Sequence, residues 1–271
     1  MIPDRRLAGT TVTHALRWRD QHGEPAAPGG TVTATVTSLR SGVTSPVTPS
    51  TVGDTSTVTL DGAAWSEPDD LTFAWSVDGV VRRHTRLQLV GAVPFTLTEA
   101  RASDPTLGGG RWPDELLREA RHVVEVECER ITGRVWVPVL QAWVGRARAG
   151  RIRGPHEPRQ VVRVLVDDMP QDPAAVTATP GFLDGSWREG ARVTVIIEAG
   201  PDVPPADLRA AMLLRLRHLV AAARSAIPDR ATSFAVVEGG VFRLAQPGAL
   251  STGQPDVDAV YHRYRVAVPV A

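Results

Sequence analysis

Residues 1–92 alternate between apolar and polar positions with a period of two. The segment TVTATVTSL at 31–39 alternates Val or Ala with Thr, and STVTL at 56–60 repeats the pattern. Because successive side chains of a strand point to opposite faces, this alternation predicts strands with one buried face. Three more strands are expected, at 11–20, 71–77 and 80–90. The last two are joined at Asp78-Gly79, a favoured two-residue hairpin turn.

From Phe95 onward, apolar residues recur with the period of a helix instead of that of a strand. Thr96 and Glu99 have the spacing of a capping box, in which each residue's side chain binds the other's backbone N–H. Phe95 and Ala100 flank this pair at the positions of a hydrophobic staple. A short helix is therefore expected to begin at Thr96.

A second helix is expected between Pro113, which suits a first helical position, and Gly133, which suits a helix end. Its apolar stripe consists of Leu117, Ala120, Val124, Cys128 and Ile131. Strands are expected to follow at 135–145, 160–168 and 191–200. This part of the chain is therefore predicted to combine helices with a small sheet.

The last long helix, expected over 206–226, carries the widest apolar surface of the sequence. Its core positions are Leu208, Met212, Leu213, Leu216, Leu219 and Val220. They cover more than the apolar arc of an ordinary surface helix. We therefore expect burial on two sides, with the domain covering one side and a neighbouring subunit the other. A standard protomer interface buries about 800 Å² per partner.

These patterns predict an α+β chain with two domains and an arm. Residues 1–92 are expected to form an all-β sandwich of immunoglobulin-like size. Residues 93–231 are expected to form a small helical bundle with a short β-sheet, and 232–271 an extended C-terminal arm. Trp65 and Trp75 are expected in the sandwich core, with stacking on a sugar as the alternative.

The amino-acid composition of the chain mainly serves to exclude certain classes of function. All 30 basic residues are Arg, balanced by 30 Asp and Glu, so the chain has no overall attraction to nucleic acid or to anionic membranes. Without Lys, the triplet Gly108–Gly110 cannot belong to a P-loop. Cys128, the only cysteine, is expected to be a buried thiol. No apolar run approaches the roughly 20 residues of a membrane span.

The titratable residues show no catalytic or metal-binding spacing. No two histidines have the helical i, i+4 spacing of zinc proteases. We therefore expect no catalysis, no metal and no cofactor. Because catalytic triads form in space from distant residues, an enzyme remains an alternative.

One cluster of basic residues interrupts the otherwise balanced charge. It contains Arg146, Arg148, Arg151 and Arg153, and continues to Arg159 and Arg163. Three interpretations stay open: a solvated loop, a surface for an acidic protein partner, and contact with DNA phosphates.

Two stretches resemble tailed-phage head–tail connector proteins, also called head-completion proteins or head-to-tail adaptors. The first is FTLTEARASDPTL followed by RWPDELLREARHVVEVECERITGRVWVP. The second is DLRAAMLLRLRHLV followed by STGQPDVDAVYHRYR. The resemblance covers roughly 94–265 and is strongest to connectors from phages of GC-rich actinobacteria, a source that the absence of Lys and Asn fits.

The resemblance implies a dodecameric ring in the virion neck, assembled in the host cytoplasm. Its partners would be the portal protein and the next tail component, a stopper or tail terminator, and DNA would only pass through the channel. A C-terminal arm would dock on the portal, with SFAVV and GVFRL either as a hairpin around Gly239-Gly240 or as strands added to a partner sheet. The arm residues are Phe234, Val241, Phe242, Arg243, Leu244, Tyr261 and Tyr264.

Alternatives remain for each part of this interpretation. The arm could instead fold back on its own domain. Residues 1–92 are an addition to the connector pattern, and are expected to contact capsid or neighbouring virion proteins. They could also be a binding module for carbohydrate or a surface receptor. A tail terminator or another tail protein is a further alternative for the whole chain.

Overall fold

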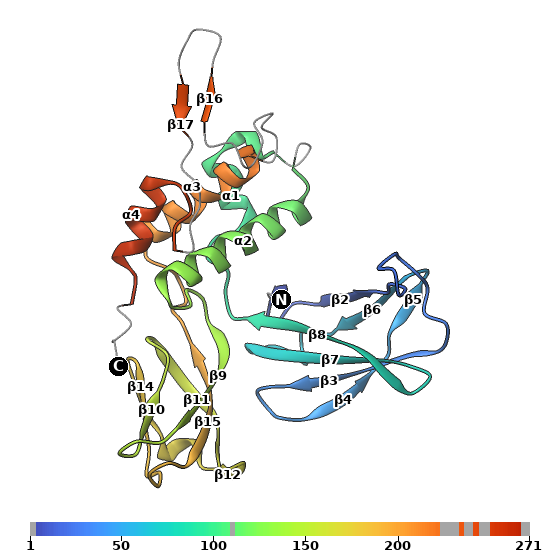
Figure 1. The fold of residues 1–271 in the computed structure, drawn as a ribbon, viewed down its shortest axis with the longest axis vertical. Helices are drawn as coiled ribbons and strands as arrows, with labels where there is room; N and C mark the ends of the chain where they lie inside the picture. Colours follow the sequence, from blue (N-terminus) through green and yellow to red (C-terminus); the bar gives the residue numbers. More distant parts are fainter. Residues whose placement is uncertain (1–3, 109–111, 223–232, 236–240, 244–249, 267–271) are drawn as a thin grey trace. The chain divides into compact units, whose positions relative to one another are not determined.

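The computed structural model describes residues 4–108, 112–222, 233–235, 241–243 and 250–266 (Figure 1). It is a mixed α+β chain that divides into two compact units. The first unit comprises residues 1–92 and 137–202, and the second comprises 93–136 and 203–271.

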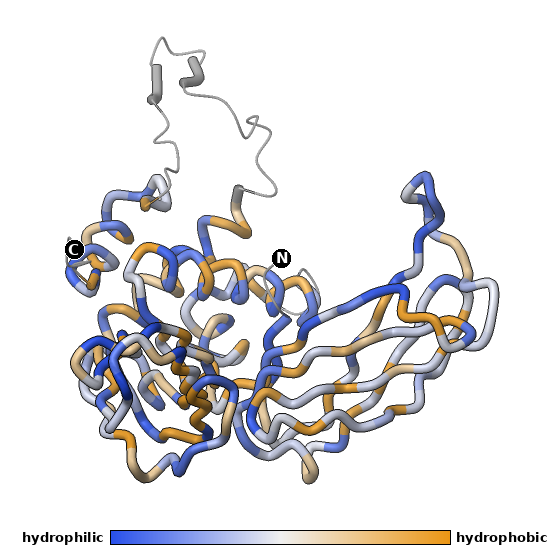
Figure 2. The backbone as a smooth tube through the Cα atoms, turned by 60° about the horizontal axis from the view of Figure 1, so that its bottom comes forward, coloured by the Kyte–Doolittle hydropathy of each residue, from blue (hydrophilic) through white to orange (hydrophobic). Residues whose placement is uncertain are grey.

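Residues 1–92 form two sheets. The larger has the order β1-β8-β7-β3-β4 and the smaller β2-β6-β5. The strand bounds are Asp4–Leu7 (β1), Val12–Arg17 (β2), Val32–Ser38 (β3), Thr44–Val47 (β4), Ser50–Val52 (β5), Thr55–Leu60 (β6), Asp69–Val77 (β7) and Val80–Val90 (β8). The five strands expected here are confirmed as β2, β3, β6, β7 and β8. Figure 2, coloured by hydropathy, shows hydrophobic and hydrophilic positions interspersed along the backbone.

The inward-facing residues of both sheets share one core. Val58 and Leu60 of β6 lie in the same buried cluster as Phe73 and Trp75 of β7. Trp75 is completely buried, which confirms its expected place, and Trp65 packs against the cluster while partly buried. Alternation along the strands therefore places one apolar side chain of every two in this core.

The turn between β7 and β8 is the predicted hairpin. Asp78 and Gly79 both have positive φ angles, 50° and 78°. A two-residue turn of this kind matches the twist of the paired strands, and Gly at the second position adopts positive φ without steric cost.

Residues 137–202 contain two further sheets around a core of their own. The order of the first is β12-β11-β15-β9 and of the second β10-β14-β13. The bounds are Val139–Arg146 (β9), Arg151–Arg153 (β10), Pro158–Val166 (β11), Met169–Gln171 (β12), Thr177–Thr179 (β13), Phe182–Asp184 (β14) and Arg192–Ala199 (β15). The three long strands confirm the prediction, whereas the short ones were not expected. Val193, Val195 and Ile197 on β15 and Leu183 on β14 lie in the buried core.

The second unit contains four α-helices in its described part: Leu97–Ser103 (α1), Asp114–Thr132 (α2), Ala206–Ala222 (α3) and Pro255–Arg263 (α4). The capping box is present, because Thr96 and Glu99 each bind the other's backbone N–H. Gly133 ends α2 in the left-handed conformation with φ 74°, as predicted. Pro113 stands one position earlier than expected, at the N-cap.

The structure corrects two expected boundaries. The domain expected over 93–231 is divided, because 137–202 closes its own core and belongs with the first unit. The arm expected over 232–271 is also divided, because α4 packs into the core of the second unit. The inserted segment that remains between α3 and α4 contains the short strands Ser233–Ala235 (β16) and Val241–Arg243 (β17).

Candidate functional site

The long helix α3 forms the centre of the helical core. Its buried positions are Leu208, Ala211, Met212, Leu216 and Val220. Leu213, Leu214 and Leu219 are half-buried and pack against the same cluster. Of the six predicted core residues, four are therefore confirmed as buried, and Leu213 and Leu219 are partly buried against the same cluster. Residues of α1, α2 and α4 join the same cluster and cover α3 within its own unit, while Leu213, Leu214 and Leu219 stay only partly buried.

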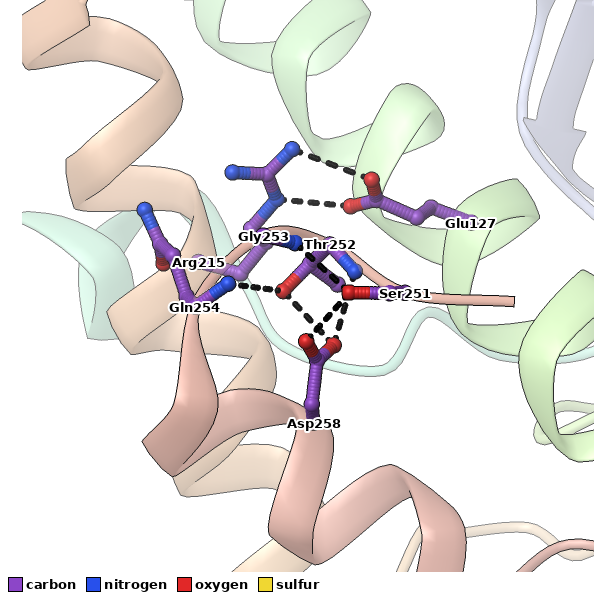
Figure 3. Close-up of polar contacts among 7 residues, drawn as sticks. All are labelled: Glu127, Arg215, Ser251, Thr252, Gly253, Gln254 and Asp258. Atoms are coloured by element: carbon purple, nitrogen blue, oxygen red, sulfur yellow. Dashed lines mark hydrogen bonds and ion pairs between the residues drawn. The ribbon is translucent and has the colours of Figure 1, made fainter. Parts of the chain in front are cut away.

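An ion pair joins α3 to α2 beside this core. Arg215 donates two hydrogen bonds to Glu127, at 2.6 Å from Nε and 3.0 Å from Nη2 (Figure 3). The two side chains are only 12% and 11% exposed. A bidentate pair in this position fixes the rotation of one helix against the other, although its desolvation offsets much of its Coulomb energy.

A second polar cluster holds the chain where it enters α4. The carboxylate of Asp258 accepts hydrogen bonds from the Ser251 hydroxyl (2.6 Å), the Thr252 backbone N–H (2.7 Å) and the Thr252 hydroxyl (2.8 Å). The same hydroxyls accept from the next turn, Ser251 from Gly253 N–H and Thr252 from Gln254 N–H. Figure 3 shows these contacts converging on Asp258. The loop before α4 is therefore tied to the first turn of the helix.

These contacts also set the protonation of Asp258. Burial raises the pKa of this carboxyl, but the hydrogen bonds from Ser251 and Thr252 outweigh burial and hold the pKa below its ordinary value. Sequence reasoning did not identify Asp258, Glu127 or Arg215. The available signal was the sequence STGQPDVD, in which Ser and Thr precede a helix-starting Pro and an acidic first turn.

The far end of α4 is tied down as well. The Tyr264 hydroxyl donates to Asp207 at the start of α3 (2.6 Å), and the Tyr264 carbonyl accepts from Arg134 Nη2 just beyond α2 (2.8 Å). The Tyr264 ring packs edge-on against the ring of Trp136, with 5.3 Å between the two ring centroids. The first turn of α4 is therefore tied to the loop before it, and its C-terminal end is tied to the start of α3 and to the residues that follow α2.

The prediction of Tyr261 and Tyr264 as anchors for a partner is corrected by this packing. Tyr261 is completely buried in the helical core, in the same cluster as Cys128, and burial raises the pKa of its hydroxyl. Tyr264 is half-buried and engaged with its own unit. The reason is the i, i+4 spacing of Val257 and Tyr261, which places both on the inner face of α4. For these residues, the fold-back alternative holds.

The segment between α3 and α4 contains the predicted hairpin strands. β16 and β17 pair antiparallel in a two-stranded sheet, with Phe234 opposite Phe242 and Ala235 opposite Val241 (Figure 1). This pairing confirms the hairpin expected from SFAVV and GVFRL, including the strand positions of Phe234, Val241, Phe242 and Arg243. Leu244 and the Gly239-Gly240 turn lie outside the described residues.

The basic cluster is placed on β9, on β10 and on the turn between them. Arg151 is paired with Asp184 (2.5 Å) and lies over the ring of Phe182, and Arg146 donates to the Gly190 carbonyl (3.1 Å). Arg148 and Arg153 are exposed and have no ion pair within the described residues. The structure therefore divides these four arginines into two engaged cations, Arg146 and Arg151, and two that are available to solvent or to a partner. Farther along the cluster, Arg159 is paired with Asp202 at 2.7 Å.

Comparison with protein-family models finds no match for this sequence, and a search of curated proteins finds no significant match. Among the described helices, none combines the length and the apolar character that crossing a membrane requires. Within the same residues, His, Cys, Asp and Glu side chains do not gather in threes in a way that could hold a metal ion. The candidate site is therefore defined by its geometry: a hairpin-bearing insertion whose flanking helices are fixed to one core.

Proposed function

We propose that the chain is a structural protein of a tailed-phage particle, an adaptor that forms an oligomeric ring between the portal and the next tail component. The ring, dodecameric in the connectors that the sequence resembles, would extend the DNA channel in the virion neck. Residues 1–92 would be an immunoglobulin-like sandwich added to this adaptor, positioned to contact capsid or other virion proteins.

The observation that carries the proposal is the insertion between α3 and α4. Its strands pair with each other, while α3 is buried in the core and the entry to α4 is held by Asp258. An element fixed at both ends to a rigid unit can present a hairpin without disturbing that unit. Paired strands also offer free backbone groups for addition to a partner sheet, a common mode of protein recognition.

The proposal therefore relocates the docking element. In place of an arm over 232–271, we assign portal docking to the insertion 223–249, and we assign α4 to the scaffold that supports it. This assignment keeps Phe234, Val241, Phe242 and Arg243 as docking residues and removes Tyr261 and Tyr264 from that role.

Two further features suit a ring. The half-buried Leu213 and Leu219 of α3 retain apolar surface that a neighbouring subunit would cover. Arg148 and Arg153 would be repeated around the ring axis, and because their fields add, they would attract an acidic partner surface or the passing DNA.

Replacing 223–249 with a Gly-Ser linker of equal length tests the docking assignment. The variant is co-expressed with the portal protein of the same phage and recovered through a tag on the portal. We expect loss of co-purification together with unchanged circular dichroism and unchanged amide exchange in α4, because the scaffold contacts remain. Recovery equal to that of the unmodified chain would reject the insertion as the docking element.

A further inference from the structure

A pocket of about 520 Å³ lies in the portion of the first unit formed by residues 1–92. One wall is the loop that follows β2, with Trp18, Arg19 and Pro28. The other is the β7–β8 hairpin, with Val77, Arg82 and Arg83. Its volume falls within the range of ligand sites, and its lining combines apolar surface with several cations.

A β-bulge brings two arginines to this pocket. The register of β7 and β8 shifts between the pairs Trp75–Arg83 and Ser76–Val81, so that Arg82 is an extra residue on β8. In a regular strand, successive side chains point to opposite faces, whereas a bulge can turn two neighbours toward the same side. Both Arg82 and Arg83 accordingly line the pocket.

Both guanidinium groups are available for a ligand. Arg82 and Arg83 are exposed, and neither forms an ion pair within the part of the chain that the structure describes. The two acids of the lining accept backbone hydrogen bonds: Asp20 accepts from the N–H groups of His22 and Glu24 in its own turn, and Asp78 accepts from the N–H of Thr31, just before β3. The lining therefore contains three arginines against two acids, and neither acid forms an ion pair with Arg82 or Arg83 in the described part of the chain.

An open sheet edge adjoins these arginines. β1 pairs with β8 only over Leu87–Val90, which leaves Val80–Arg86 without a strand on that side among the described residues. Val80 and Val81 in this segment are 52% and 51% exposed. An exposed edge of this length can accept an added strand, since its backbone donors and acceptors repeat along the segment.

We propose that this edge and pocket bind an extended, acidic peptide segment of a partner protein. The segment adds as a strand beside Val80–Arg86, and its carboxylates form charge-assisted hydrogen bonds with Arg82 and Arg83. Charge complementarity selects an acidic segment, and the open edge selects a peptide over other anions. The exposed Val80 and Val81 favour apolar residues between the acids.

The test uses the full chain and a fluorescein-labelled peptide of sequence VDVEVDV in an anisotropy titration. A neutral peptide, VSVQVSV, and an acidic peptide with alternate backbone nitrogens methylated serve as comparison probes. We expect VDVEVDV to bind and both comparison peptides to bind at least about tenfold more weakly, because one lacks the charges and the other the backbone donors. Equal binding of the methylated peptide would overturn strand addition.

Variants locate the site. Arg82→Gln and Arg83→Gln should each weaken binding of VDVEVDV about tenfold, and the double variant further. Arg17→Gln removes the same charge outside the pocket lining and should change binding less than twofold. An oligoglucuronate is titrated in parallel: binding of this saccharide in place of the peptide would overturn the choice of a peptide ligand. Absence of peptide binding, or equal binding by the double variant, would overturn the proposal.

Discussion

Substitution of Asp258 should release α4 from its scaffold. Asp258→Ala removes the acceptor of three hydrogen bonds at 2.6–2.8 Å, two from Thr252 and one from Ser251. Hydrogen bonds to a charged group contribute about 1.5–3 kcal/mol each. Because these three share one half-buried carboxylate and water can replace part of them, we expect a total cost of about 2–4 kcal/mol for opening α4.

Hydrogen exchange measured by mass spectrometry can follow this opening directly. The expected cost corresponds to an increase of roughly 30- to 1000-fold in the exchange of α4 amides. Asp256→Ala is the matched control: it removes an acid from the same helical turn, but Asp256 is exposed and accepts no hydrogen bond from the Ser251–Thr252 loop. Equal acceleration by both substitutions would contradict a role for the Asp258 hydrogen bonds, because it would assign the effect to helix charge alone.

Three further predictions concern the cores. Leu216→Asp places an unpaired charge at a fully buried position and should abolish the helical circular dichroism of the second unit. Leu213→Asp, at a half-buried position, should retain most of this signal. Equal helical signals from the two variants would contradict this prediction. Arg215→Leu leaves Glu127 buried without this partner and should lower the free energy of unfolding, measured by urea titration, by about 3 kcal/mol. The double variant Glu127→Leu with Arg215→Leu should lower it less, because no charge is then left unpaired. A double variant that is destabilised as much as the single one would contradict this role of the ion pair. Burial lowers the pKa of His14, so its contribution to stability is present above about pH 6.5 and is lost as pH falls through the lower folded pKa, by at most about 1.4 kcal/mol per pH unit. Between pH 7.5 and pH 5, the thermal unfolding temperature should therefore decrease less for His14→Gln than for the unmodified chain. An identical decrease would exclude His14 as the cause.

Local sequence signals identified the elements whose stabilising contacts are close in sequence. Thr96 and Glu99 are three residues apart, and their mutual hydrogen bonds need no tertiary partner. Gly133 adopts the left-handed conformation that a helix end requires. The strands at 31–39 and 56–60 alternate regularly because one sheet face covers a core. These features were therefore predictable from the residues alone.

The features that the sequence did not predict depend on contacts between residues that are distant in the chain. Val257 and Tyr261 form an apolar pair on a short helix, a pattern that fits a core face and a docking face equally well. Their burial depends on Cys128 and Leu216, which are distant in sequence. The arginine pair at Arg82 and Arg83 was not expected either, because a bulge reverses the alternation on which strand facing was judged.

The short strands were not predicted from the sequence, for a related reason. β10 and β14 contain three residues each, RIR and FLD, which is too short for a period to be recognised. Their pairing places Ile152 and Leu183 in the core, and it forms because the chain segments meet in space. It also explains why part of the basic cluster is engaged, since Asp184 pairs with Arg151 across the same strands.

The most direct test of the proposed function is electron microscopy of the full chain co-purified with a portal protein encoded in the same genome. We expect a closed ring of this chain on the portal, with the segment that carries β16 and β17 in contact with portal density and α4 packed within its own subunit. Single copies without ring contacts, or a ring whose portal contacts lie elsewhere than this hairpin, would contradict it.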